Sequence, residues 1–474
     1  MKFKVQVVTI TDDGQESIRD LACTERDDLT AESLGLSVAD SKTLLQFLQE
    51  VVVEWQMKTY LDSQRYCPDC GKLRHSKGSH HIAFRTVFGT IPVESPRLEQ
   101  CSCQAHDTQS FSPLAVLLPE HTTPELLYLE SKWAALASYG MTVKMLEDVL
   151  PMGEPLQPVT IRNHVLKLAE RLEDELGEER VFFIEGCPRD RGELPIPDGP
   201  LTVGIDGGYV KAQGMEQGVF EVIAGKSILA FRRDEERSEP SSQAFAFVRT
   251  YDEKPRRRLF EHLQAHGMQA NQQIEFLSDG GDTVRDLQLY LSPEANHLLD
   301  WFHITMRITT LTQTAKGLPE LSGEGSQALR TDVLRELERI KWFLWHGNVF
   351  KALPLLSAVE SDLEDEEFTS GNATARKLYK AVCEFTTYIE NNRSFIPNYG
   401  ERYRNGERIS TGFVESTVNY VVSKRMVKKQ QMKWSQRGAH LLLQIRTHVL
   451  NGQWEQTFRR WYPGFRTQRQ AVPA

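Results

Sequence analysis

The sequence predicts an α/β protein built around a mixed five-stranded sheet, with an all-α segment inserted into it. Residues 201–209 read as a buried strand that ends in an aspartate and two glycines, and residues 273–281 repeat that pattern. Apolar β-branched residues favour a strand, and paired glycines favour a turn after it. Residues 301–399, in contrast, have the apolar spacing of helices, which indicates the inserted segment.

The length and the charge of the chain limit what it can be. Its 474 residues suffice for about three domains. No apolar run approaches a membrane span, and residues 1–10 lack the apolar core of a signal peptide, so we expect a cytoplasmic protein without a membrane partner. The net charge of −9 weakly disfavours a nucleic-acid binder, but residues 401–474 hold 14 Lys and Arg against 4 Asp and Glu. This contrast favours one surface that faces a polyanion, with a solvated charged face as the alternative.

The chain begins with strand-like alternation, an acidic loop at Asp27 and Asp28, and a helix from about residue 41 to 61. Helical spacing of its apolar residues marks this helix as a packing element. Farther along, we expect the acidic run at residues 360–367 to cap or join helices of the insertion. The predicted segments are a strand and helix region (1–62), a zinc ribbon (63–108), a helical DNA-binding region (109–185), a linker (186–200), the first part of the core (201–310), the insertion (311–400), the last part of the core (401–455) and a basic tail (456–474).

Four of the seven cysteines gather around a predicted hairpin with strands at residues 82–87 and 90–94. They are Cys67 and Cys70, with Cys-x-x-Cys spacing, and Cys101 and Cys103, with a less usual Cys-x-Cys spacing. Four thiolates on two tight turns suit tetrahedral Zn²⁺. The pattern therefore predicts a zinc ribbon whose closed Zn²⁺ site stabilises the fold.

Other interpretations of these cysteines remain open. His106 or His80 could replace one of the thiolates as a zinc ligand. Reduced or redox-active thiols are the alternative to a metal site. A disulfide framework explains the pattern poorly, because the number of cysteines is odd and the chain has no secretory signal.

The helical region contains a short helix, a turn and a longer helix that begins near residue 158. Arg162, Asn163 and His164 lie near the start of the longer helix, where a helix-turn-helix protein contacts DNA bases. An ordinary helical hairpin would produce the same pattern. The composition of residues 186–200, rich in proline and glycine, marks a linker before the sheet.

The first part of the core contains the predicted strands. Strands at residues 218–231 and 244–251 would form an antiparallel meander with the first strand, and helix, strand, helix and strand follow. This order is typical of an RNase H-like fold, in which the first and fourth strands lie side by side. We therefore expect Asp206 and Asp279, at the ends of these two strands, to be neighbours.

Neighbouring carboxylates at a strand end favour a bound cation, because a buried charge needs compensation. Glu415 is the candidate third ligand for a pair of divalent ions, while Asp282 and Asp286 are rivals of Asp279. Oxygen ligands suit Mg²⁺ or Mn²⁺. The basic residues that follow on the predicted helix of Glu415 could contact phosphates; they are Lys424, Arg425, Lys428 and Lys429.

The residues resemble those of bacterial insertion-sequence transposases with an Asp-Asp-Glu catalytic core, and most closely the ISKra-type group. The resemblance covers roughly residues 60–455. It rests on the two strand-end aspartates, the Asp-x-x-His signature at residues 300–303, and the block at residues 412–446. The cysteine pairs and the hairpin between them match as well.

The resemblance implies metal-dependent DNA cleavage and strand transfer at terminal inverted repeats, with two Mg²⁺ or Mn²⁺ ions per active site. Asp206, Asp279 and Glu415 would be metal ligands. Asp300 and His303 would support the site, by contact with the scissile strand or a flipped base. The ribbon and the helical region would recognise the repeats, and the basic C-terminal segment would hold phosphates of repeat and target DNA. The chain would act as a homo-oligomer on DNA, associated with the nucleoid.

Two other functions fit the same residues. One is an RNase H-like nuclease of repair or recombination, which would cut DNA without joining it to a target. The other is a transposase-derived regulator that binds DNA but has lost the chemistry. The three intact acidic positions favour an enzyme over this regulator.

Overall fold

The structure is a computed structural model that describes residues 2–11, 14–26, 29–103, 109–118, 120–153, 155–179, 193–195, 197, 199–214, 218–229, 241–291, 295–318, 326–428 and 432–467. The chain divides into two compact units. Unit 1 comprises Met1–Ala169 and Gly452–Ala474, and unit 2 comprises Glu170–Asn451. Within the described ranges, no helix combines the length and the apolar character that crossing a membrane requires.

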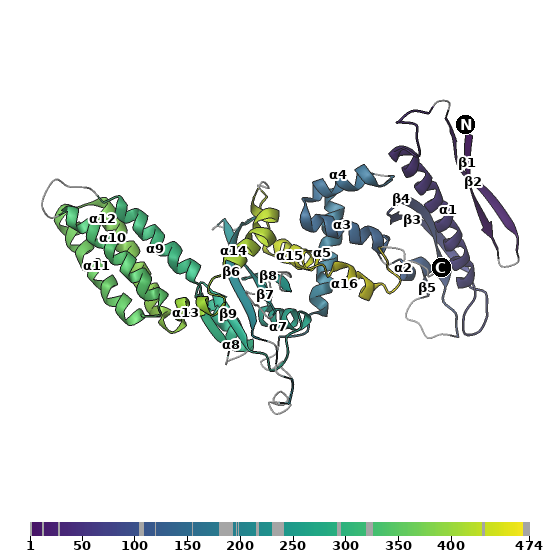
Figure 1. Cartoon of the computed structure of the whole chain (residues 1–474). Coiled ribbons are helices and arrows are strands. Elements are labelled where there is room, and N and C mark those ends of the chain that lie inside the picture. The colour runs from purple at the N-terminus through teal and green to yellow at the C-terminus, as the bar shows by residue number, and fades with distance from the viewer. Residues whose placement is uncertain are drawn as a thin grey trace. The chain divides into compact units, whose positions relative to one another are not determined.

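Unit 1 contains two small sheets and a group of helices (Figure 1). Its strands are β1 (Lys2–Ile10), β2 (Glu16–Glu25), β3 (Ser76–Thr86), β4 (Gly89–Glu99) and β5 (Ser110–Phe111). Its helices are α1 (Val38–Gln64), α2 (Pro113–Leu117), α3 (Pro124–Leu136), α4 (Tyr139–Val149) and α16 (Trp454–Trp461). The division between the units falls within α5 (Pro158–Glu175).

The first half of unit 1 is a long helix packed against a hairpin. A capping box starts α1. The side chain of Ser37 accepts a hydrogen bond from the backbone N–H of Asp40, and the side chain of Asp40 accepts one from the backbone N–H of Ser37. Strands β3 and β4 are antiparallel and turn at residues 87–88, with Gly89 in the left-handed region at φ +123°. Val53 and Met57 of α1 pack on the apolar face of this hairpin. Both strands are longer than the sequence predicts, and β2, which pairs with β1, was not predicted at all.

The C-terminal segment contributes to the core of unit 1. Trp454, Phe458 and Trp461 of α16 are buried, and the Trp454 ring forms edge-to-face contacts with the other two rings. The ring of Phe458 also meets Tyr128 of α3 at 5.4 Å between centroids, and the Trp454 indole donates to Ser131. The segment expected to be a basic tail therefore begins inside a packed helix.

Unit 2 combines a five-stranded sheet with helices on both faces and a separate helical bundle (Figure 1). Its strands are β6 (Leu201–Lys211), β7 (Val219–Ile228), β8 (Ser242–Val248), β9 (Ile274–Ser278) and β10 (Asn296–Leu299). Its helices are α7 (Pro255–Ala265), α8 (Asp282–Leu291), α9 (Trp301–Lys316), α10 (Ser326–Trp345), α11 (Val349–Ser370), α12 (Ala373–Asn391), α13 (Tyr399–Arg404), α14 (Gly412–Val418) and α15 (Gln436–Leu450), with a 3₁₀ helix η1 (Arg393–Phe395) and a π-helix η2 (Asn419–Val427).

The sheet is mixed, with the strand order β10-β9-β6-β7-β8. Strands β6, β7 and β8 form an antiparallel meander, while β9 and β10 run parallel to β6. The prediction that the two aspartate-bearing strands lie side by side is confirmed, because β6 pairs directly with β9. The α/β class and the mixed five-stranded sheet are confirmed as well.

Alternation along β6 separates the two faces of the sheet. Leu201, Val203 and Ile205 belong to a buried cluster with residues of α7 and α8. The intervening residues point to the opposite face, where α14 contacts β6 and β7 and α15 contacts β8. Asp206 belongs to this second set, so it points to the same face as α14.

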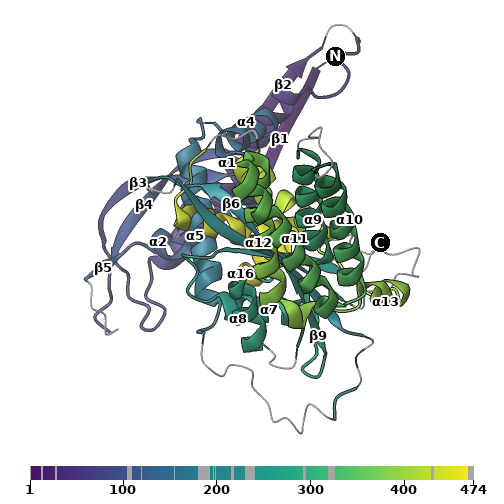
Figure 2. The same ribbon diagram turned by 90° about the vertical axis from the view of Figure 1, so that its left-hand side faces the viewer.

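The predicted all-α insertion is a bundle of α9, α10, α11 and α12 with its own buried core (Figures 1 and 2). Leu337, Val359 and Val382 are among its fully buried residues. The expectation that residues 360–367 cap or join helices is wrong, because this acidic run lies inside α11. The helix that follows Glu415 also differs from expectation, since α14 ends at Val418 and continues as the π-helix η2.

Candidate functional site

The prediction that the first strand ends at Asp206 is wrong, because β6 continues through Gly207 and Gly208 to Lys211 and pairs Asp206 with Ala224 of β7. Strand β9 does end before Asp279, at Ser278. The parallel register pairs Gly204 with Leu277, and Asp206 and Asp279 each lie two residues beyond that pair. Residues at matching positions of neighbouring parallel strands lie close together, so the two aspartates are near each other at the point where β9 ends. Asp206 is half-buried and Asp279 is exposed, so the Asp206 carboxylate is partly enclosed by the protein and the Asp279 carboxylate faces solvent.

Helix α14, which carries Glu415, crosses β6 at very close range. A β-carbon on Gly204 would overlap the side chain of Val414 and lie 2.7 Å from Phe413 Cζ, and one on Gly208 would lie 2.9 Å from Val418 Cγ1. Asp206 lies between these two glycines on the same face of the strand. Because only glycine permits this approach, the sequence around Asp206 brings the helix of Glu415 onto the same strand.

Charges crowd around the Asp206 carboxylate. Burial raises its pKa, a 2.7 Å bond from the backbone N–H of Gly207 and the charge of His303 lower it, and the carboxylates of Asp279 and Asp300 raise it again. The net effect is a raised pKa, because burial and two like charges outweigh one bond and one histidine. Negative charge assembled in this way is what a cation would relieve.

The three predicted metal ligands do not form a compact cage for one ion. Two groups of described residues have ligand atoms that all lie within 4.8 Å of one another, and neither contains Asp206, Asp279 or Glu415. A pair of ions about 4 Å apart has its ligands distributed over both ions, which needs a wider arrangement. The donor set of carboxylate oxygens and the shared negative charge suit hard divalent cations.

Asp300 connects the sheet to the start of α14. Its carboxylate is fully buried and caps α9 by accepting a hydrogen bond from the backbone N–H of Phe302 at 2.8 Å. It also accepts hydrogen bonds from the backbone N–H of Thr411, at 3.0 Å, and from the Thr411 hydroxyl. Thr411 directly precedes α14. Asp300 therefore positions the start of α14 through Thr411. His303 Nε2 lies 3.6 Å from Asp300 Oδ2 and is only half-buried, so it can face a ligand.

The helical insertion touches the loop of Asp279. The hydroxyl of Tyr388, on α12, donates to the carbonyl of Asp279 at 3.0 Å. Asn392 lies against Gly280, whose φ is +89°, and accepts from Arg285 at 2.7 Å. The insertion thus supports the strand end that carries Asp279. Sequence reasoning missed these residues, because their spacing carries no motif.

The basic run after Glu415 divides into exposed and buried residues. Lys424 is exposed over the ring of Tyr420 (5.1 Å), and exposed Lys428 donates to Asn419 at 2.7 Å. Arg425 is fully buried, with its guanidinium 5.2 Å from the centre of the Trp434 ring. Its predicted contact with phosphate is therefore corrected to a packing role. Lys429 lies outside the described residues.

Arg446 of α15 forms hydrogen bonds with the backbone of the π-helix η2. Its Nε donates to the carbonyl of Val421 at 2.6 Å, and its Nη2 donates to the carbonyl of Tyr420. These carbonyls belong to η2, where the wider helix leaves backbone oxygens open to outside donors. Burial and the neighbouring Arg425 lower the pKa of Arg446 to about 10.

The helix-turn-helix candidates of unit 1 also have different environments. Arg162 and Asn163 of α5 are exposed. His164 is turned inward, and its Nδ1 lies 2.6 Å from Oε2 of Glu130, a fully buried residue of α3. His164 therefore contributes to the packing of α5 on α3, while Arg162 and Asn163 remain candidates for DNA contact.

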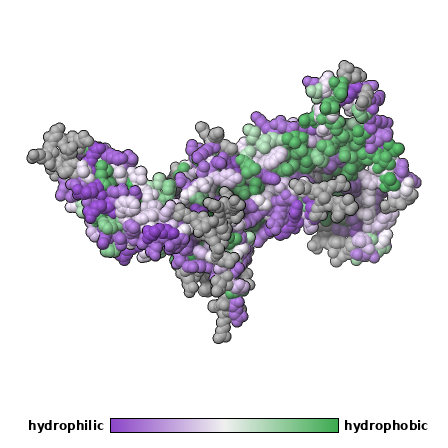
Figure 3. All heavy atoms as spheres, viewed as in Figure 1, coloured by the Kyte–Doolittle hydropathy of each residue, from purple (hydrophilic) through white to green (hydrophobic). Residues whose placement is uncertain are grey.

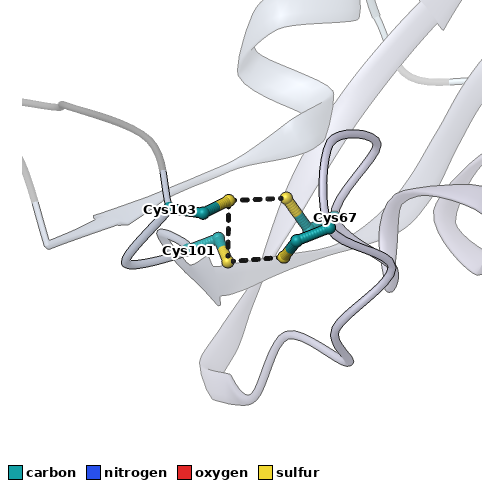
Figure 4. A group of neighbouring side chains, drawn as sticks. Cys67, Cys101 and Cys103 are labelled. Carbon is teal, nitrogen blue, oxygen red and sulfur yellow. Dashed lines mark hydrogen bonds between the residues drawn. The ribbon is translucent and has the colours of Figure 1, made fainter.

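The four cysteines converge as predicted (Figure 4). Their sulfur atoms all lie within 4.8 Å of one another, with Cys67–Cys103 at 3.5 Å and Cys70–Cys101 at 3.3 Å. Bonds of about 2.3 Å to a tetrahedral ion require sulfur atoms roughly this far apart, so the cluster could hold Zn²⁺. A bond from the backbone N–H of Cys70 is the main cause that lowers the pKa of Cys67 to about 6, which favours the thiolate that a metal needs. His80 lies outside this group, and His106 lies outside the described residues.

A second group, Glu173, Asp252 and His440, has the spacing of a metal site but encloses an arginine. Arg258 donates to both carboxylates, with Nε to Asp252 at 2.7 Å and Nη2 to Glu173 at 2.8 Å. Burial alone would raise the pKa of Glu173, but bonds from His440 and Arg258 outweigh it and lower this pKa to about 2. The guanidinium already supplies the positive charge, so the group is a buried ion-pair network.

Unit 1 also has an apolar groove, which we define by β2, the segment at residues 29–36 and the start of α1. Its volume is about 890 Å³, and its lining includes Phe3, Leu21, Leu29, Leu34, Leu44 and Phe47. Hydrophobic surface gathers over α1 and the β1–β2 hairpin (Figure 3). Contiguous exposed apolar surface is typical of an interaction site or a ligand-binding groove.

No protein-family model matches this chain, and no curated protein matches it either.

Proposed function

We propose that the chain is a DNA transposase of a bacterial insertion sequence, which cleaves DNA and transfers strands at terminal inverted repeats. One observation carries the proposal. Strands β6 and β9 are parallel neighbours at the centre of a sheet with the order β10-β9-β6-β7-β8, and α14 crosses β6 beside Asp206. This order supports an RNase H-like core, in which the ends of the first and fourth strands carry catalytic carboxylates.

The proposed metal ligands are Asp206, Asp279 and Glu415. Two Mg²⁺ or Mn²⁺ ions would activate a water or a 3′-hydroxyl and neutralise charge on the leaving oxygen. Asp206 is the best placed of the three by its half-buried position and its negative neighbours. Glu415 is exposed at the start of α14, where it can turn toward the strand ends.

Other residues of the site would hold the substrate or the ligands. Asp300 would hold the start of α14 in place through its hydrogen bonds with Thr411. Half-buried His303, beside Asp300, would donate a hydrogen bond to the scissile strand. Lys424 and Lys428 of η2 would bind phosphates beside the site, because both are exposed cations on the element that follows Glu415.

We propose that the four-cysteine cluster binds one structural Zn²⁺ and forms a zinc ribbon. The sulfur distances support this assignment, and the hairpin of β3 and β4 between the cysteine pairs is the matching scaffold. The ribbon, with Arg162 and Asn163 of α5, would contact the terminal repeats.

The chain would act as a homo-oligomer on paired DNA ends, as the resemblance implies. The exposed apolar surface of β1, β2 and α1 supports this, since a second copy would remove it from water. Molar mass by light scattering, with and without DNA, tests it. A monomer in both conditions would remove this part of the proposal.

The decisive experiment uses duplexes that carry the DNA flanking the gene, with Mg²⁺ or Mn²⁺. The wild-type protein should nick these duplexes and join them to target DNA, and Asp206→Asn should abolish both reactions. Asp362→Asn is the matched control and should retain both reactions, because Asp362 is an exposed carboxylate on α11 of the bundle and is not a candidate metal ligand. Cutting by Asp206→Asn at the wild-type rate overturns the assignment.

The remaining outcomes separate the alternatives. Cleavage of any DNA without joining would indicate an RNase H-like nuclease. Specific DNA binding without cleavage by the wild-type protein would indicate a transposase-derived regulator.

A further inference from the structure

The insertion presents an arginine beside the acidic strand ends. Arg307 lies on α9, seven residues after Asp300 and four after His303, so all three share one face of the helix. Its guanidinium carbon lies 4.1 Å from the centre of the Tyr388 ring. The hydroxyl of that tyrosine donates to the carbonyl of Asp279. One aromatic side chain therefore links Arg307 to the loop of a proposed metal ligand.

Arg307 is exposed and has no acidic partner among the described residues. Several other arginines of unit 2 are paired with carboxylates, as Arg402 is with Glu275 and Arg249 is with Glu221. Helix α9 contains no Asp or Glu from its first residue to its last. The positive charge of Arg307 is thus available to an anion.

Stacking on Tyr388 prepares the guanidinium for such an anion. An aromatic face holds the planar group in one orientation and leaves the N–H donors at its edge unused. A phosphate can accept two of these donors at once. The Tyr388 hydroxyl is within electrostatic reach of Arg307, Asp279 and Asp300 together, which places the cation at the rim of the acidic site.

We propose that Arg307, held by Tyr388, binds a backbone phosphate of the DNA strand that enters the Asp206–Asp279 site. This inference rests on the proposed function. It assigns the helical insertion a part in binding substrate, since both residues belong to the bundle of α9–α12.

The test measures binding of a fluorescent DNA duplex of arbitrary sequence at several salt concentrations, without added divalent metal. Removing one phosphate contact should lower the slope of log affinity against log salt by about one unit. We expect Arg307→Gln to show this loss, with roughly tenfold weaker binding at moderate salt. Arg307→Lys should keep the slope but bind less tightly, because a lysine keeps the charge without the stacked plane.

Arg339→Gln is the matched control. Arg339 is exposed on α10 of the same bundle and is paired with Glu336, so its loss should leave the slope unchanged. An unchanged slope for Arg307→Gln, or an equal loss in both variants, overturns the inference. If the wild-type protein cuts DNA while Arg307→Gln binds normally, the inference fails and the proposed function stands. If the wild-type protein neither binds nor cuts DNA, both fail.

Discussion

Val414 occupies the space that a side chain on Gly204 would need. A β-carbon on Gly204 would overlap Val414 and lie 2.7 Å from Phe413 Cζ, so α14 is seated directly on β6. We therefore expect Gly204→Ala to push α14 away from the sheet and to destabilise the protein by about 1–3 kcal/mol. Urea unfolding measures the stability, and DNA cleavage measures the displacement of Glu415.

The matched control lies on the same helix. Gly412 is the first residue of α14, and a β-carbon there would meet only Ser410 Oγ, at an ordinary 3.7 Å. Gly412→Ala should leave stability unchanged or raise it by up to about 1 kcal/mol. Equal effects of the two substitutions would contradict the close seating of α14.

The cysteine cluster predicts a defined zinc content. Purified protein should contain about one Zn per chain, because four thiolates complete a tetrahedral site. Cys67→Ser with Cys70→Ser should remove the metal and unfold the ribbon, seen as lost protection of β3 and β4 from hydrogen exchange. Cys23→Ser, an exposed cysteine on β2 outside the cluster, should retain the metal. Zinc retained after loss of both Cys67 and Cys70 would exclude the cluster as the ligand set.

The contact between Asp300 and Thr411 predicts energetic coupling. Thr411→Val removes the hydroxyl that donates a hydrogen bond to Asp300. Asp300→Asn weakens the same hydrogen bond by replacing the charged acceptor with an amide. Each should cost about 1–3 kcal/mol, because a buried polar group loses its partner. The double variant should lose less than the sum of the single losses, and Thr411→Ser should behave as wild type. Strictly additive losses would mean that the two side chains act independently.

The sequence was sufficient to predict the core of the candidate site. Apolar runs followed by Asp-Gly-Gly predicted that Asp206 and Asp279 lie on neighbouring strands, and β6 and β9 are parallel neighbours, although β6 continues past Asp206 to Lys211. The cysteine pairs predicted a cluster for the same reason, since a knuckle and a hairpin leave few ways to arrange four sulfur atoms. In both cases short local rules determine where the side chains point.

Local rules could not predict which polar residues face inward. Arg425 and His164 lie in segments that read as basic or DNA-reading helices, yet Trp434 and Glu130 hold them inside. A buried charge depends on a partner far away in the sequence, and periodicity does not identify that partner. The π-helix η2 escaped prediction for a related reason, because its extra backbone width depends on Arg446 of α15.

Two histidines in surroundings that exclude water, half-buried His262 and buried His297, predict that acid destabilises unit 2. Burial, with the nearby His266 and His448, lowers the pKa of His262 to about 3, and burial with Arg285 lowers that of His297 to about 4. In the unfolded chain both take up a proton near pH 6.5. Below that pH the unfolded state binds more protons than the folded state, so stability falls as the pH falls. Each histidine contributes roughly 1.4 kcal/mol per pH unit between about pH 6 and its folded pKa.

Urea unfolding at pH 7, 6 and 5 measures this dependence, in a range above the folded pKa of Glu173, about 2. His262→Asn should reduce the fall in stability between pH 6 and pH 5 by the roughly 1.4 kcal/mol that one proton contributes. The variant should be less stable at every pH, because Ser227 loses one of its two imidazole partners. His346→Asn, at an exposed position on the surface of the bundle, should keep the wild-type dependence. If His262→Asn and the wild-type protein lose the same stability between pH 6 and pH 5, His262 does not take up a proton on unfolding, and the water-excluding environment assigned to it is wrong.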